Sequence, residues 1–142
     1  MLTYNFQQVY DNFKMKFYQS LCKNSKELNM QEAFSLDVIH MLGNPTILEF
    51  ANYMEISQPN ATYKINQMIQ KGFLTKQLCD DDKRSYRLKV TEKFLKVYRG
   101  NDRFIKKTLK DIESMFKPEE VQILQRMLNE ISIYMSQGEK ND

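Results

Sequence analysis

The chain has 142 residues, of which 42% are apolar and 27% are charged, and its formal net charge is +3. This length suits one domain rather than two, and the composition is that of a globular protein. No apolar run is long enough to span a membrane and no signal peptide is evident, so we expect a cytoplasmic protein without a membrane partner.

The positive charge is concentrated in the middle of the chain. Residues 58–89 carry 7 basic and 3 acidic side chains, whereas residues 1–57 carry 4 and 6, and residues 90–142 carry 10 and 9. A basic segment of this kind is suited to binding a polyanion, although many solvated surfaces show a similar excess.

The first third of the chain predicts two helices. In the first, over residues 1–22, apolar residues recur every three or four positions. This stripe comprises Phe6, Tyr10, Phe13, Phe17 and Leu21. The second helix is expected to begin at a cap, Asn29, and to end at Gly43. Its apolar positions are Ala33, Leu36, Ile39 and Met41.

Two further helices follow, separated by a tight turn. Thr46 is expected to cap the short helix ILEFANYM, and Ser57 to cap a fourth helix with Pro59 in its first turn. In the short helix the expected buried residues are Leu48, Ala51 and either Tyr53 or Met54. In the fourth helix, which Gly72 ends, they are Ala61, Ile65, Met68 and Ile69.

After the fourth helix the sequence period changes to that of strands. FLTKQL and SYRLKV predict two strands joined by a charged hairpin tip, residues 80–84. The tip holds three consecutive aspartates, but a calcium loop needs oxygen ligands at alternate positions, a central glycine and a distal glutamate. We therefore expect neither a metal nor another cofactor.

Two long helices are predicted to complete the chain. Their apolar stripes are Phe94, Tyr98, Ile105, Leu109, Ile112 and Phe116, interrupted by Asn101, and then Val121, Leu124, Leu128, Ile131 and Met135. Stripes of this length exceed what one small domain can cover. We expect residues 1–22 and 94–135 to form a dimer interface, with an intramolecular bundle as the alternative.

Residues 30–93 are predicted to form a winged helix-turn-helix, which consists of a helix, a tight turn, a second helix and a two-stranded wing. The fold class is therefore mainly α with a small β-hairpin (α+β). The fourth helix is suited to the major groove of DNA, because amide side chains match adenine and apolar groups can touch thymine methyls. Its expected contacts are Gln58, Pro59, Asn60, Thr62, Tyr63, Asn66 and Gln67, with Lys64 and Lys71 meeting phosphates. The alternative is an ordinary solvated face.

The segment PTILEFANYMEISQPNATYKINQMIQKGFLTKQLCDDDKRSYRLKVTEKF resembles the DNA-binding lobe of the MarR (multiple antibiotic resistance regulator) family. The matching pieces are FANYMEIS, KGFL, DDKRS and VTEKF, and KPEEVQILQRML resembles the final dimerisation helix. The likeness covers residues 30–135 in order and implies a single MarR-type domain over residues 1–142. Three residues depart from the pattern: Glu55, where a small or flexible residue is usual, Tyr63, where arginine is frequent, and Phe94, where glycine is common.

The resemblance also implies how the wing is used. Arg84 is expected to enter a minor groove with Asp82 holding its orientation, whereas the alternative is a solvent-exposed ion pair. Lys83 and Ser85 complete the wing contacts. Together with the fourth helix, the wing predicts a homodimer bound to an A/T-rich inverted repeat of double-stranded DNA.

A repressor released by a small apolar or aromatic effector is the function that the resemblance implies, with a pocket between the wing lobe and the dimer helices. The candidate lining residues are Phe13, Phe17, Met41 and Tyr98, although such residues are often plain core. We expect the single histidine, His40, to be packed in the fold rather than to contact a ligand.

Three other functions were weighed. A redox-sensing regulator is disfavoured because Cys79 adjoins three aspartates and Cys22 lies near a helix C-terminus, and both settings oppose a thiolate. An enzyme is not expected, since the chain has no glycine-rich phosphate loop and no nucleophile elbow. A winged helix that binds protein instead of DNA remains open, and the salt dependence of binding separates the two.

Overall fold

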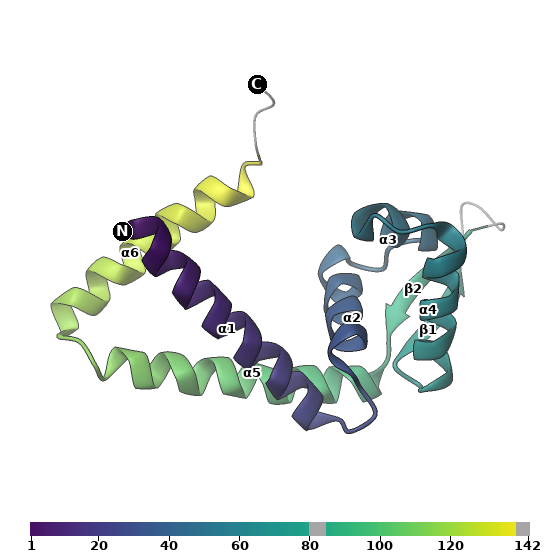
Figure 1. Ribbon diagram of the computed structural model, residues 1–142, viewed down its shortest axis with the longest axis horizontal. Helices are drawn as coiled ribbons and strands as arrows, with labels where there is room; N and C mark the ends of the chain where they lie inside the picture. The colour runs from purple at the N-terminus through teal and green to yellow at the C-terminus, as the bar shows by residue number, and fades with distance from the viewer. Residues whose placement is uncertain (80–84, 139–142) are drawn as a thin grey trace. The chain divides into compact units, whose positions relative to one another are not determined.

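The computed structural model describes residues 1–79 and 85–138 and is mainly helical, with one two-stranded antiparallel sheet (Figure 1). The elements are α1 Leu2–Asn24, α2 Met30–Leu42, α3 Ile47–Met54, α4 Gln58–Gln70, β1 Leu74–Leu78, β2 Tyr86–Val90, α5 Glu92–Glu113 and α6 Pro118–Ser136. This confirms the predicted fold class. The chain forms two compact units, Met1–Phe104 and Ile105–Asp142, with the boundary inside α5.

Three helices of the first unit begin at side-chain caps, as the sequence predicts. The Asn29 side chain accepts the Glu32 N–H at 2.8 Å, and the Glu32 carboxylate accepts the Asn29 N–H, which makes a capping box. Thr46 forms the same box at the start of α3, and Ser57 caps α4. Local sequence therefore sets where these helices start.

The turn between α3 and α4 is left-handed at a residue with a side chain. Glu55 has φ 54° and ψ 43°, and its N–H donates to the Ala51 and Asn52 carbonyls. Only glycine adopts this region without strain, and other residues pay about 1 kcal/mol. Glu55, which stands where a small or flexible residue is usual, is thus the residue of this turn whose backbone conformation favours glycine.

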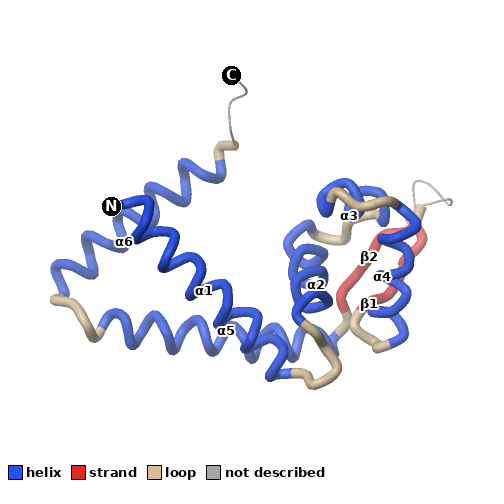
Figure 2. Tube along the Cα trace, viewed as in Figure 1, coloured by secondary structure: helices blue, strands red, loops and turns tan. Residues whose placement is uncertain are grey.

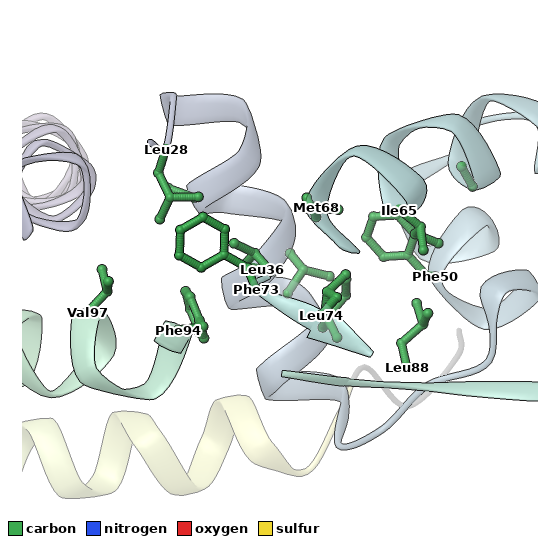
Figure 3. Close-up of a cluster of buried hydrophobic side chains, with 14 of the residues drawn as sticks. Leu28, Leu36, Phe50, Ile65, Met68, Phe73, Leu74, Leu88, Phe94 and Val97 are labelled. Atoms are coloured by element: carbon green, nitrogen blue, oxygen red, sulfur yellow. The ribbon is translucent and has the colours of Figure 1, made fainter. Parts of the chain in front are cut away.

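The core of the first unit gathers side chains from α2, α3, α4, the sheet and the start of α5 (Figure 3). Its largest fully buried members are Phe50, Phe73, Phe94, Leu21, Leu36, Ile39, Ile65, Met68, Leu74 and Leu88. Phe73 and Phe94 come from the chain on either side of the wing, so the wing is anchored in the core at both of its ends.

The predicted buried face of α3 is wrong in part. Leu48 is 53% exposed and Tyr53 is also exposed, whereas Phe50 is buried alongside Ala51. The helix begins at Ile47, so positions 47, 50, 51 and 54 share the inward face at the spacing of a helix. Met41 likewise lies 63% exposed in the last turn of α2.

The wing is a regular hairpin. Leu74 pairs with Val90 and Leu78 with Tyr86, and the Cys79 N–H donates to the Ser85 carbonyl one step further out. The start of α3 holds β2, because the Leu88 N–H donates to the Pro45 carbonyl and Thr46 forms a bridge with Arg87. The strands confirm the prediction, while the tip at residues 80–84 lies outside the described residues.

The second unit consists of the end of α5, a short turn and α6, which appear as blue helices joined by a tan segment (Figure 2). The helix begins at Pro118 as predicted, with the Lys117 N–H donating to the Glu120 carboxylate. None of the α6 residues, all of which are described, is buried in the single chain. Within the described parts of the chain, no helix is long and apolar enough to cross a membrane.

Candidate nucleic-acid interface

α4 exposes one continuous polar face. Ala61, Ile65 and Met68 are fully buried against the core, so the side chains half a turn away point outward. The exposed residues are Gln58, Pro59, Asn60, Tyr63, Asn66, Gln67 and Gln70. The exposed residues of the predicted set thus share one surface. Gln70 also lies on this surface, and sequence reasoning missed it although it follows Tyr63 by seven positions on the same helical face.

The side chains of three predicted contact residues are already engaged within α4. The Gln67 amide donates to the Tyr63 hydroxyl at 3.0 Å, which holds both side chains on the outer surface. The Thr62 hydroxyl donates to the Gln58 carbonyl at 2.9 Å and the residue is half-buried. Its methyl group, rather than its hydroxyl, is therefore the part left for a partner.

The start of α4 faces the wing across a hollow of about 360 Å³. The hollow brings together the start of α3, the start of α4 and the first residues of β2. Its lining residues are Thr46, Ile47, Leu48, Gln58, Ser85 and Tyr86. Ser85 and Gln58, predicted from separate segments to contact one partner, thus border the same space, whereas Asp82, Lys83 and Arg84 lie outside the described residues.

The structure gives Lys71 a different position from the one expected. Its Nζ lies 2.7 Å from a Glu32 carboxylate oxygen and 3.0 Å from the Glu27 carbonyl oxygen. The Glu32 side chain is only 12% exposed. An ammonium held in this way reaches a phosphate only by breaking the pair, so we assign Lys71 to the scaffold. Lys64 makes no hydrogen bond or ion pair within the described residues.

Lys93 extends this scaffold. Its Nζ donates to the Glu27 carboxylate at 2.8 Å and to the Lys71 carbonyl at 2.7 Å, and it lies 4.7 Å from the centre of the Phe73 ring. The two lysines therefore link the loop before α2 to the end of α4 and the start of α5. These contacts fix the base of α4 in the fold.

The predicted effector residues fall into two aromatic groups. Phe13 stacks on Phe17 in α1, and Phe17 meets Tyr18, which in turn contacts Phe34 of α2. Tyr98 of α5 packs edge-on against His40 of α2 at a ring distance of 4.6 Å. His40 is thus packed against an aromatic ring, whereas the exposed Met41 joins neither group.

A buried carboxylate, Asp37, lies between the two groups. It is 8% exposed and makes no hydrogen bond or ion pair with any described residue. Burial raises the pKa of its carboxyl, with His40 acting in the opposite direction. Burial and then Asp37 raise the pKa of Tyr18 to about 12, and the same two causes raise the pKa of Tyr98. Sequence reasoning missed Asp37, although it lies three positions from both Phe34 and His40.

The cysteine environments bear on the redox alternative. Cys22 and Cys79 are both free. Burial raises the pKa of the Cys22 thiol, and Glu32 adds to the effect. A raised pKa lowers the thiolate fraction and hence the reactivity with oxidants. In residues 1–79 and 85–138, no three acidic, histidine or cysteine side chains are grouped to hold a metal ion.

The fold and one segment of the chain match known proteins. Residues 28–86 match the family model of the MarR family. A MarR family protein from Bacillus stearothermophilus superposes with a TM-score of 0.76 at 17% identity, covering 95% of this chain and 93% of that chain. Streptococcus pneumoniae FabT in complex with DNA gives 0.70 at 19% identity, with 96% of each chain covered. A mutant of Staphylococcus aureus MepR bound to an oligodeoxyribonucleotide gives 0.67 at 14% identity, covering 95% and 98%.

Proposed function

We propose that the chain, whose residues 28–86 match the MarR family model, belongs to that family and binds double-stranded DNA as a sequence-specific transcription regulator. The outward face of α4 is the observation that carries the proposal. That face is rich in amides and α4 has no acidic side chain to repel phosphates. Two structures of the same fold hold DNA.

The proposed readout follows from the chemistry of this face. Asn60, Asn66, Gln67 and Gln70 each offer a paired donor and acceptor, which matches the major-groove edge of adenine. α4 has no arginine, the usual partner of guanine. With Arg84 in an adjacent minor groove, both readers favour A/T-rich sequence.

A homodimer is proposed because large apolar side chains are left uncovered in the single chain. In α6 they include Leu124, Leu128, Ile131 and Met135, and in α1 they include Phe6, Val9 and Tyr10. Within the second unit, α6 buries none of its stripe. Two symmetric copies would read an inverted repeat with half-sites about 34–36 Å apart.

Repression and release by an effector complete the proposal. A regulator bound over an operator excludes other proteins from it, and an apolar or aromatic effector would act at the α1, α2 and α5 aromatic groups. These groups include Phe17 and Tyr98, each of which keeps part of its surface exposed. The proposal thus separates a DNA-reading surface from a ligand-sensing one.

A selection from random duplex DNA tests the readout. The wild-type protein is expected to recover an A/T-rich inverted repeat, and Asn60→Ala should relax the preference at its base position by about 1–3 kcal/mol. Asn52→Ala, at an exposed site on α3, serves as the matched control and should leave the motif unchanged. A motif dominated by G·C contacts under α4 would contradict the proposal, as would a pool without any motif.

Lys64 in α4 and Lys71 at its C-terminal cap are expected to behave differently when replaced. Lys71→Met should lower the free energy of unfolding by about 1–2 kcal/mol because the largely buried Glu32 carboxylate loses its ammonium partner and keeps only the Asn29 N–H. Lys64→Met should leave stability within about 0.5 kcal/mol and reduce the slope of log affinity against log salt by about one. Urea unfolding and DNA titrations at several salt concentrations measure both quantities.

If Lys71→Met instead reduced the salt slope and left stability unchanged, while Lys64→Met did the opposite, Lys71 would be a DNA contact. A slope near zero for the wild-type protein would instead favour the protein-binding alternative, since only phosphate neutralisation releases condensed counterions.

A further inference from the structure

A mostly buried carboxylate on α2 has no hydrogen-bond or ion-pair partner among the residues that the structure describes. Asp37 projects from α2 between Phe34 and His40, which lie three positions before and after it on one helical face. Its carboxylate makes no hydrogen bond or ion pair with a described residue, although it is 8% exposed. A carboxylate that is mostly buried and lacks a cationic partner gains free energy from a positive group brought beside it.

The surrounding side chains come from three helices. Tyr18 of α1 contacts Phe34 at a ring distance of 5.8 Å, and Tyr98 of α5 contacts His40 at 4.6 Å. Asp37 influences the ionisation of both tyrosines, which places it within electrostatic range of each. All four rings keep some exposed surface. Asp37 shares one face of α2 with Phe34 and His40, which contact Tyr18 and Tyr98, so four aromatic side chains with exposed surface lie around this part of α2.

A buried amide on α5 is unsatisfied. Asn101 follows Tyr98 by three positions, is 1% exposed, and neither its amide nitrogen nor its amide oxygen has a partner within residues 1–79 and 85–138. An unpaired buried amide costs free energy that a hydrogen-bonding ligand or a local rearrangement would recover. Asn101 thus leaves two buried polar atoms without partners among the described residues, one helical turn from Tyr98.

We propose that this site binds an organic cation, a quaternary or protonated amine attached to an apolar or aromatic body. The carboxylate of Asp37 would pair with the positive charge, and the faces of Tyr18 and Tyr98 would attract it through their negative quadrupoles. The apolar body of the ligand would lie against Phe17 and Phe34. An anionic aromatic ligand is disfavoured, since it would place like charge against Asp37.

This inference rests on the proposed function, because it names the chemical class of the regulator's effector. A cation that binds the full-length protein better when DNA is absent would weaken DNA binding by the same factor, since coupling between two binding sites is reciprocal.

The test compares two probes of the same shape. Phenyltrimethylammonium carries one positive charge, and tert-butylbenzene is its neutral isostere. Calorimetry on the full-length protein is expected to show the cation binding at least about tenfold more tightly than the neutral probe, a difference of 1.4 kcal/mol. Asp37→Asn should remove that preference and leave the affinity for tert-butylbenzene unchanged. Asp111→Asn, at an exposed site on α5, is the charge-matched control.

Each outcome decides one statement. Equal binding of the two probes, no binding of the cation, or an unchanged cation affinity in Asp37→Asn would overturn the inference. DNA binding by the same unliganded preparation is measured separately by fluorescence anisotropy. Protein that binds DNA but not the cation leaves the proposed function standing alone. If the protein binds the cation but not DNA, the cation site is supported and the proposed function as a DNA-binding regulator is contradicted.

Discussion

Replacing Leu128 with aspartate is expected to convert the protein from a dimer to a monomer and to weaken its binding to an inverted repeat by about 100-fold or more. Leu128 lies in the middle of the exposed α6 stripe and is 53% exposed in the single chain. A carboxylate at the centre of an apolar interface loses its hydration without gaining a partner, which costs several kcal/mol. A monomer would then meet each half-site independently, without the gain from linked binding.

Two measurements check this expectation. Sedimentation gives the mass of the particle, and fluorescence anisotropy gives the affinity for a labelled inverted repeat. Gln122→Asp adds the same charge to α6 outside the stripe and should remain dimeric. A Leu128→Asp protein that stays dimeric, or a monomer that binds the full repeat as tightly as wild type, would contradict the proposed assembly.

A second large effect is expected from Phe73→Ala, which should lower the free energy of unfolding by about 3–5 kcal/mol. Phe73 is fully buried and its ring lies beneath the Lys93 ammonium. Its N–H donates to the Met68 carbonyl and its carbonyl accepts the Thr91 N–H, so it joins the end of α4 to the end of the wing. Loss of the ring leaves a cavity at this joint.

The expected change corresponds to a fall in melting temperature of about 10 to 20 °C. Thermal and urea unfolding followed by circular dichroism measure it. Tyr86→Ala removes a half-exposed aromatic from the same sheet and should cost well under half as much. If the two substitutions cost the same, Phe73 would not be the joint that the structure indicates.

Local signals in the sequence predicted the helix and strand positions well. Asn29, Thr46 and Ser57 each sit within three residues of the backbone groups that they cap, so short-range chemistry decides those helix starts. The hairpin followed from alternation in SYRLKV. Both signals act between neighbours in the chain, which is why they can be read without tertiary structure.

Side-chain environments that depend on distant segments could not be read in this way. The Lys71–Glu32 pair spans 39 positions, and nothing near Lys71 in the sequence distinguishes it from a phosphate contact. Leu48 and Phe50 both suit a helix interior, and only the packing of α3 against its neighbours selects Phe50. Asp37 appeared as an ordinary polar position because its burial cannot be read from its neighbours in the chain.

The polar face of α4 could be predicted from the sequence only in part. Its outward direction followed from Ala61, Ile65 and Met68, whose spacing fixes the inward side. The internal hydrogen bonds of Thr62 and Tyr63 did not follow, because each depends on a side-chain rotamer. The surface was therefore predictable, but the groups left free on it were not.

The left-handed turn at Glu55 restricts how this sequence can vary among descendants. Glycine there would relieve strain, and asparagine would be tolerated, because both enter the left-handed region readily. Valine, isoleucine and threonine would meet their own backbone and are expected to be purged even though the position is exposed. The set of amino acids tolerated at this exposed position is thus limited by the backbone conformation, and not by any contact that the side chain makes.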